Sequence, residues 1–322
     1  MSRYLSLSVD LDNHWSYLKT HGSDSWRGFP SYLDLVVPLV CEFADEHQVD
    51  LTLFVVGQDA DLPQNADAMR QIGESRHEVG NHSFHHEPWL HLKTRTEIEE
   101  EIGRAHEVIQ EATGKGALGF RGPGFSISRA TMRVLQDNGY RYDASTLPTF
   151  IGPLARAFYM RQSSLDEAES TQRSLLFGSV REVLRPISPY VWDFEDHGGG
   201  VIEIPVTTMP LLRLPIHATY LLYMARVSPG LSRMYLRTAL ALCRLTGVQP
   251  SILLHSLDFI GAGDISDLGF FPGMDMTGEV KRGLLAQYVT AMKDYGEIVT
   301  VGEHSTRAAG SGLPTQPVMS LA

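Results

Sequence analysis

The sequence predicts a single-domain α/β protein built on a parallel sheet. Short apolar runs of strand length alternate along the chain with longer amphipathic stretches. Polar residues capable of chemistry stand at the C-terminal ends of several apolar runs. Both features are typical of parallel α/β sheets and barrels, in which the loops at the carboxyl edge converge on one site. The length of 322 residues suits one α/β barrel domain.

The individual elements follow from periodicity and from turn residues. Seven segments have a strand pattern: 4–10, 51–56, 77–82, 117–121, 201–206, 251–255 and 297–301. Six segments have a helical pattern: 31–48, 64–75, 95–113, 127–138, 216–246 and 278–295. Gly114 and Gly139 follow two of the helical segments, as C-terminal stop signals do. Residues 305–322 show no periodicity, so we predict a flexible C-terminal tail after a domain that spans 1–304.

The composition excludes several classes of protein. A net charge of −11 argues against nucleic acid as a partner, because phosphate binding needs a basic surface. Cys41 and Cys243 are too few for a disulfide framework or a thiolate metal site. The chain has no run of about 18 apolar residues that would span a membrane. Its start, "MSRYLSLSVDLD", enters a strand pattern without the features of a signal peptide, so we expect a cytoplasmic protein.

Residues 209–249 depart from this acidic composition. They contain five arginines and no Asp, Glu or Lys, so the remainder of the chain carries −16. Helices rich in Leu, Tyr, Met and Arg resemble helices that lie on anionic membranes, and arginines also bind phosphates. We therefore expect this insertion or helical region to contact a substrate phosphate or the inner membrane surface through Arg213, Arg226, Arg233 and Arg237. The alternative is an ordinary helix packed on the sheet, with its arginines paired to acids elsewhere.

Histidines and aspartates in two short stretches predict a metal site. In "HEVGNHSFHHEPWLH" (77–91), His82 and His86 are four residues apart, so one helical turn would point both imidazoles the same way. "SVDLDNHW" adds Asp10 and Asp12, whose charges repel unless a cation or a proton stabilises them. Two histidines and one carboxylate leave coordination positions open, which suits a catalytic divalent metal. We expect zinc first, with Co, Mn, Fe or Ni as the other candidates.

Plainer interpretations of these residues also exist. The histidines could form a solvated loop, and a single buried Asp could cap a helix. Under the metal interpretation the remaining nearby histidines are not ligands; these are His14, His77, His85 and His91.

Four motifs in order carry a resemblance to a known family. "SVDLD", "HSFHH", "FRGPGF" and "LLH" together resemble the NodB-homology polysaccharide deacetylases, the family 4 carbohydrate esterases, over about residues 4–302. The resemblance implies a distorted parallel (β/α) barrel of about seven strands. It also implies a C–N hydrolase, a deacetylase or deformylase, that uses one divalent metal ion.

The resemblance assigns roles position by position. It implies that Asp12, His82 and His86 bind the metal. Asp10 is then the general base, Arg121 holds Asp10 in place, and His255 is the acid that protonates the leaving amine. Gly124 stands where the family usually has a tyrosine, and its backbone amide can still stabilise the oxyanion. The family's fourth motif has no clear match, and Asp143 and Asp258 are the candidate substitutes that tune His255.

The predicted function is removal of an acetyl or formyl group from an amino sugar. The missing signal peptide and the arginine-rich segment favour a sugar linked to polyprenyl phosphate or another glycolipid, as in a cytoplasmic subset of the family that serves cell-envelope or polysaccharide biosynthesis. One alternative is a hydrolase of small or cyclic amides, as in allantoinase-like relatives. Another is a non-catalytic, membrane-associated metal-binding barrel, which would have no reason to keep Asp10, Arg121 and His255.

Overall fold

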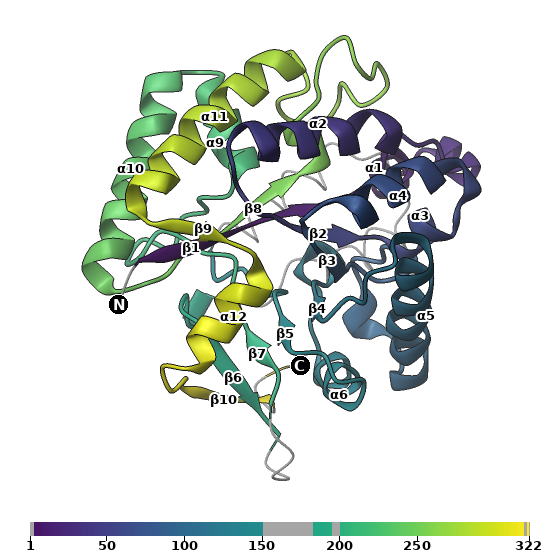
Figure 1. The fold of residues 1–322 in the computed structure, drawn as a ribbon, viewed down its shortest axis with the longest axis horizontal. Coiled ribbons are helices and arrows are strands. Elements are labelled where there is room, and N and C mark those ends of the chain that lie inside the picture. The colour runs from purple at the N-terminus through teal and green to yellow at the C-terminus, as the bar shows by residue number, and fades with distance from the viewer. Residues whose placement is uncertain (1–2, 151–182, 195–199, 319–320, 322) are drawn as a thin grey trace.

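The fold is an α/β arrangement around one ten-stranded sheet (Figure 1). The computed structural model describes residues 3–150, 183–194, 200–318 and 321. The strands are β1 (Tyr4–Asp10), β2 (Thr52–Val55), β3 (Glu78–Asn81), β4 (Gly119–Phe120), β5 (Tyr142–Asp143), β6 (Tyr190–Asp193), β7 (Ile202–Glu203), β8 (Ser251–His255), β9 (Glu297–Val299) and β10 (Thr315–Pro317).

The sheet is mostly parallel, as predicted. Its order is β10-β6-β7-β5-β4-β3-β2-β1-β8, with β9 also paired to β1. In the described ladders, β6–β7 is the antiparallel pair. All seven predicted strands are present, and β5, β6 and β10 bring the sheet above the expected number of about seven.

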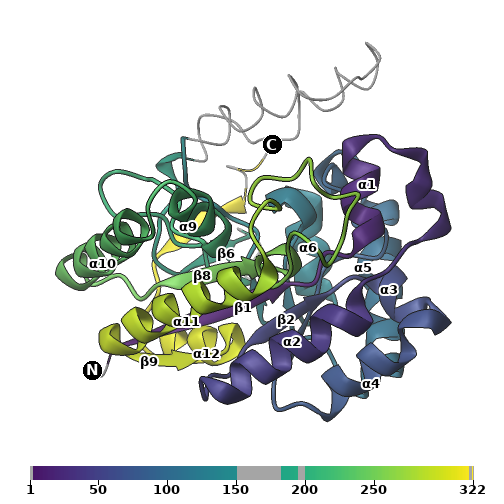
Figure 2. The ribbon, with the colours of Figure 1, turned by 90° about the horizontal axis from the view of Figure 1, so that it is seen from above.

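Helices cover the sheet in the order that the sequence predicts (Figures 1 and 2). The α-helices are α1 (His14–His21), α2 (Leu33–Glu46), α3 (Gly57–Asp61), α4 (Ala66–Glu74), α5 (Arg95–Thr113), α6 (Arg129–Asp137), α9 (Ala218–Ala225), α10 (Pro229–Thr246), α11 (Gly278–Tyr295) and α12 (Val301–Ala309). The six predicted helical segments are confirmed, but 216–246 divides into α9 and α10. Ser228 caps α10 by accepting the N–H of Leu231, and Pro229 follows at the first helical position.

The C-terminal tail is more regular than the sequence predicts. Residues 305–309 complete α12, and β10 pairs in parallel with β6, placing Thr315 beside Val191. The side chain of Val318 is 2% exposed. The expectation of a flexible tail is therefore wrong for these residues, whereas 319–320 and 322 lie outside the described residues. The strand is too short to show a pattern, and its partner lies far away in the sequence.

Burial of β1 on both faces explains why the site lies at an end of this strand. Leu5, Leu7 and Val9 on one face are fully buried, and so are Ser6 and Ser8 on the other. Strands covered on both faces are typical of parallel sheets in α/β proteins. Polar side chains can reach solvent there only where the strands end.

Strand register brings the predicted site residues to one edge of the sheet. Asp10 is the register partner of His255 in the β1–β8 ladder. Asn81 is the partner of Phe120 in the β3–β4 ladder, so His82 and Arg121 follow at matching positions. The carboxyl ends of β1, β3, β4 and β8 therefore share one level, as expected for a site in this class of fold.

A buried neutral histidine should make the stability of this fold depend on pH. His304 on α12 is fully buried, and its Nδ1 lies 2.8 Å from Ser6 Oγ. Burial, aided by nearby Arg307, lowers the pKa of His304 to about 3. Below pH 6.5 the unfolded chain therefore binds a proton that the folded chain does not. The free energy of unfolding should fall by up to about 1.4 kcal/mol per pH unit from this residue as the pH decreases from 6.5 toward 3.

Urea unfolding at pH 7, 6 and 5 checks this prediction. A His304→Gln variant is expected to be less stable at pH 7 but to lose less stability with acid than the unmodified chain. Parallel pH dependences for the two proteins would show that His304 is not buried in its neutral form.

Candidate functional site

Asp12, His82 and His86 come together at the carboxyl edge of the sheet. His86 Nε2 lies 3.0 Å and His82 Nε2 lies 3.3 Å from Asp12 Oδ1. Ligands bound about 2.1 Å from a tetrahedral zinc ion lie about 3.4 Å apart, so this spacing fits one small cation. Among the described residues, these three side chains form a group of possible metal ligands whose ligand atoms all lie within 4.8 Å of one another.

The orientation of His82 also fits a metal ligand. Its Nδ1 donates to the Arg121 carbonyl oxygen at 2.6 Å, which leaves Nε2 to face Asp12. Metal-binding histidines are usually fixed by such a bond from the other ring nitrogen. Burial lowers the pKa of His82, but the carboxylates of Asp10 and Asp12 outweigh this effect and raise it. The two carboxylates therefore stabilise a positive charge at this position, and the charge of a bound metal ion would be stabilised in the same way.

The loop that carries the two histidines is irregular rather than helical. Ser83 and His86 have positive φ angles of 59° and 51°, so the expected helical turn is wrong. Residues other than glycine rarely adopt this conformation, and the surrounding structure must hold it in place. Glu101 on α5 does so by accepting the backbone N–H groups of Phe84 and His85.

Glu101 binds more donors than its place in a helical pattern suggests. Its side chain also contacts His85 Nδ1 at 2.6 Å and Lys93 Nζ at 2.9 Å. Burial raises the pKa of Glu101, but these hydrogen bonds prevail and lower it to about 2. His85 is therefore turned toward Glu101, in agreement with the prediction that it is not a ligand. Sequence reasoning missed Glu101, because an acidic residue in an exposed helical pattern carries no signal of its own.

A second buried carboxylate supports the loop after β1. Asn13 caps α1 and donates Nδ2–H to Asp59 Oδ1 at 2.7 Å. Trp15 Nε1–H donates to the same oxygen at 2.8 Å, and the Tyr32 hydroxyl donates to the Asp12 carbonyl oxygen at 2.6 Å. Burial raises the pKa of Asp59 to about 7. These contacts fix the backbone of Asp12, and neither Asp59 nor Tyr32 was singled out from the sequence.

Asp12 itself is stabilised in its charged form. Burial raises its pKa, but the imidazoles of His86 and His82 prevail and hold the pKa well below its usual range. The Tyr17 hydroxyl lies 3.3 Å from Oδ2. A carboxylate that stays ionised at low pH is a suitable ligand for a divalent cation.

Asp10 forms a buried ion pair beside the triad. Arg121 Nη1 donates to Asp10 Oδ1 at 2.6 Å and to Ser8 Oγ at 3.0 Å, while its Nε donates to the Ala144 carbonyl oxygen. The arginine is fully buried. The second oxygen, Asp10 Oδ2, lies 3.9 Å from His82 Nε2. One carboxylate oxygen is thus held, and the other faces the candidate metal position.

His255 is held by a threonine that sequence reasoning missed. The Thr219 hydroxyl lies 2.9 Å from His255 Nδ1 and donates to Asp258 Oδ2 at 3.2 Å. Asp258 also accepts the backbone N–H of His255, and burial raises the pKa of its carboxyl group. The chain Nδ1–Thr219–Asp258 orients the ring. The sequence gives no sign of this contact, because Thr219 lies 36 positions before His255.

Of the two candidate tuning residues, Asp258 contacts His255. Asp143 instead hydrogen-bonds to Ser145 and to Glu203, its register partner across β5 and β7. Burial raises the pKa of both carboxyl groups in this pair. The structure therefore gives Asp143 no part in orienting His255.

Replacing Thr219 by valine tests the orienting role of its hydroxyl group. If His255 is the proton donor that the family resemblance implies, kcat should fall up to about 100-fold, since a misplaced donor slows transfer, while metal content stays unchanged. Thr219→Ser retains a hydroxyl and should stay within a few-fold of the unmodified chain. Equal losses in both variants would show that packing, not the hydrogen bond, explains the effect.

Gly124 has the backbone geometry that a glycine favours. It lies in a short 3-10 turn (Pro123–Phe125) with φ 60°, and a Cβ there would stand 3.0 Å from Pro88 Cβ. Its N–H makes no hydrogen bond within the described part of the chain. The amide is therefore available to a ligand, and its contact with an oxyanion remains a prediction.

The four arginines expected to bind phosphate or membrane lie in different environments. Arg226 pairs with Asp275 at 2.7 Å, and Arg213 donates to the Arg185 carbonyl oxygen. Arg233 donates to the Gln287 side chain, and Arg237 has no partner among the residues described. Arg226 thus matches the alternative of pairing with an acid, whereas Arg213 is held by a backbone carbonyl. In the described chain, helices that are long and apolar enough to cross a membrane are absent.

Comparison with known proteins points to one family. Residues 30–142 match the family model of polysaccharide deacetylases. The chain is 24% identical over 204 residues to the peptidoglycan deacetylase of Helicobacter pylori, a match that covers 60% of this chain and 66% of that relative. It is 33% identical over 106 residues to a peptidoglycan-N-acetylmuramic acid deacetylase of Bacillus subtilis, covering 32% and 39%. The chain thus spans less than two thirds of the length of these relatives.

Solved structures confirm the fold. The crystal structure of an inferred polysaccharide deacetylase from Mycobacterium smegmatis superposes with a TM-score of 0.64 at 17% identity. The superposition covers 98% of this chain and 93% of that one. At this identity the likeness establishes the shared α/β architecture alone. The region matched by the family model includes His82, His86 and Arg121, whereas Asp10, Asp12 and His255 lie outside it.

Proposed function

We propose that the chain belongs to the polysaccharide deacetylase family, whose model matches residues 30–142, and that it is a metal-dependent hydrolase that removes an N-acyl group from an amino sugar. One observation carries the proposal: the Asp12–His82–His86 triad lies beside the Asp10–Arg121 ion pair, and His255 ends the neighbouring strand. A triad alone could hold a structural ion. A carboxylate and an imidazole at the same strand ends add the base and the acid that amide hydrolysis requires.

The three ligands have the donor set for a catalytic divalent ion, with zinc first among the candidates. Two imidazole nitrogens and one carboxylate oxygen leave coordination positions open. When bound there, the ion would polarise the acyl carbonyl and lower the pKa of the attacking water toward about 7. Asp12, His82 and His86 would hold it, and the bonds to Arg121 and Glu101 keep the histidine loop in its binding conformation.

Proton transfer is divided between two side chains. Asp10 accepts the proton of the attacking water at Oδ2, because Oδ1 is occupied by Arg121. His255 donates a proton from Nε2 to the leaving nitrogen, while Thr219 holds Nδ1. An amine is a poor leaving group without this proton, and an imidazole can supply it near neutral pH. The Gly124 N–H hydrogen-bonds to the oxyanion as the carbonyl carbon becomes tetrahedral.

Two features bear on which amino sugar is the substrate. The H. pylori and B. subtilis relatives are named for peptidoglycan, which suggests an N-acetylated amino sugar of a glycan. The arginine-rich, acid-free segment 209–249 favours a sugar that is attached to a polyprenyl phosphate or another glycolipid. Acetyl and formyl groups differ by one methyl group, and both belong to the proposal.

Amine release from a panel of acylated amino sugars tests the function. Metal-loaded protein would be offered N-acetyl and N-formyl sugars as free sugars, as peptidoglycan fragments and as polyprenyl-phosphate conjugates. Release from glycan fragments or lipid conjugates, and not from Asp10→Asn protein, supports the proposal. Release from lipid conjugates alone supports a lipid-linked substrate.

Two outcomes would contradict the proposal. Hydrolysis of small or cyclic amides, with all sugars left intact, would assign the same machinery to small-molecule amides. Failure to release amine from any compound, with one metal bound per chain, would indicate a non-catalytic metal-binding protein.

A further inference from the structure

Helix α10 presents an exposed face that is both apolar and basic. Leu231, Met234 and Leu245 are 45%, 59% and 82% exposed, and Arg233 and Arg237 are exposed between them. The opposite face packs into the core through Ser232, Leu236, Ala239, Leu240 and Cys243. A helix in an ordinary covering layer would carry polar side chains on its solvent face.

Exposed apolar side chains are concentrated in this part of the chain. The described residues include thirteen exposed large hydrophobic side chains, and seven of them lie within 209–249, which is 41 of the 322 residues. Besides the three on α10, these are Leu211, Leu212, Tyr223 and Val227. Single exposed hydrophobic residues need no explanation, but this many in one segment mark an interaction surface.

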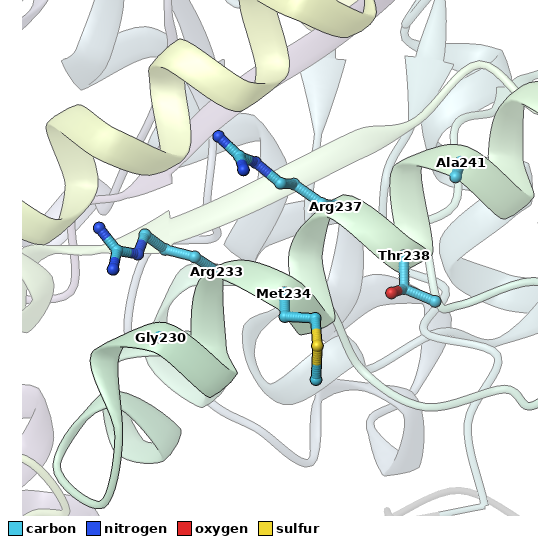
Figure 3. A pocket seen from close by; sticks show the side chains of 6 residues that line it. All are labelled: Gly230, Arg233, Met234, Arg237, Thr238 and Ala241. Atoms are coloured by element: carbon cyan, nitrogen blue, oxygen red, sulfur yellow. The ribbon is translucent and has the colours of Figure 1, made fainter.

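The charge on the α10 face has no acidic counterpart among the described residues. Arg233 contacts the neutral Gln287 amide, and Arg237 has no partner among the described side chains. Figure 3 shows both guanidinium groups extending to one side of the helix, with Met234 on the other. Together with Gly230, Thr238 and Ala241 they line an open hollow of about 600 Å³, and none of its described lining residues is acidic.

We propose that this α10 face, defined as Leu231, Arg233, Met234, Arg237 and Leu245, docks the protein on an anionic lipid surface. The arginines would meet the phosphate groups while the apolar side chains enter the headgroup boundary. The chain outside 209–249 carries −16 and is repelled by the same surface, so charge orients the molecule with this side toward the lipid. Docking rests on this face alone and does not require the proposed reaction.

The shape of the face favours a lipid surface over a protein partner. Its apolar side chains project singly from a helix and are flanked by arginines, whereas the core of a protein interface is depleted in charge. An amphipathic helix with arginines beside Leu and Met is the arrangement found in helices that lie in the membrane interface.

Vesicle co-sedimentation tests the proposal on the full chain. The protein should bind vesicles of phosphatidylcholine with phosphatidylglycerol, but not phosphatidylcholine alone, and added salt should weaken binding. Arg233→Gln with Arg237→Gln should weaken partitioning about 30-fold, roughly fivefold for each arginine. The matched control is Arg95→Gln with Arg104→Gln, which removes the same two positive charges. Both residues lie on α5, at the opposite side of the molecule from α10 (Figures 1 and 2).

Three results would overturn the proposal. One is equal weakening in both double variants, which would mean that only net charge matters. Another is unchanged binding in a Met234→Ser, Leu245→Ser variant, which would leave the apolar side chains without a role. A third is release by inorganic phosphate well beyond that by NaCl of equal ionic strength, which would indicate a phosphate site. Asp12→Ala protein should bind vesicles normally, which separates docking from the reaction.

Discussion

Replacing Asp12 by alanine is expected to weaken zinc binding by on the order of 100- to 1000-fold and to abolish amine release. A loss of this size is expected because each ligand contributes a comparable share of the free energy of zinc binding in protein sites. His82→Ala should have the same effect, because Asp12 Oδ1 and His82 Nε2 face one position at 3.3 Å. Competition with a zinc-binding dye measures the affinities directly.

The matched control for these variants is His85→Ala. His85 belongs to the same five-residue motif, but its ring contacts Glu101 and not Asp12. This variant should keep zinc affinity within about tenfold, the lower end of the effects of residues behind the ligands, because His85 contacts none of the three candidate ligands. A loss as large as that of His82→Ala would show that the ligand assignment is wrong.

Asp10→Asn is expected to bind metal normally and to lose about 100- to 10,000-fold in kcat, the usual contribution of a general base. Asparagine keeps the shape of the side chain, and its amide oxygen can still accept from Arg121 Nη1. It cannot take up the proton of the attacking water. Steady-state amine release and metal content, measured on the same sample, separate the two properties.

Stability needs its own control, since Asp10 is the partner of a buried arginine. Removing one partner of a buried ion pair costs about 3–5 kcal/mol, and asparagine should reduce that cost by keeping the hydrogen bond. Asp275→Asn removes an exposed partner of Arg226 and is the matched change away from the site. If Asp10→Asn kept full activity while folded and metal-bound, Asp10 would not be the base.

The candidate metal site could be predicted because its residue types are unusual over short stretches of sequence. Asp10 and Asp12 lie in one short stretch at the end of a strand pattern, and His82 and His86 lie in another. The register of parallel strands then explains why these stretches meet. The loop conformation was not predictable, because the positive φ angles of Ser83 and His86 depend on contacts with Glu101 from another element.

The residues that hold the site side chains and loops in place could not be predicted for the same reason. Thr219, Asp59 and Glu101 are of common types in ordinary positions, and only contacts across tens of residues reveal what they hold. The fold shows a similar limit. Strand β10 contains a proline and lacks an apolar alternation, so nothing in its sequence points to its partner β6. Ser228-Pro229 is a signal for the start of a new helix at α10. Sequence reasoning missed it because apolar residues continue on both sides of this pair.

The most direct test of the central claim is a metal titration of the reaction. Protein freed of metal by a chelator would be titrated with zinc while amine release from an N-acetylated glycan fragment is followed. We expect no release without metal, activity that rises to a plateau at one ion per chain, and no recovery in Asp12→Ala protein. Full activity in the metal-free chain, or equal recovery in Asp12→Ala, would contradict a reaction centred on the Asp12–His82–His86 site.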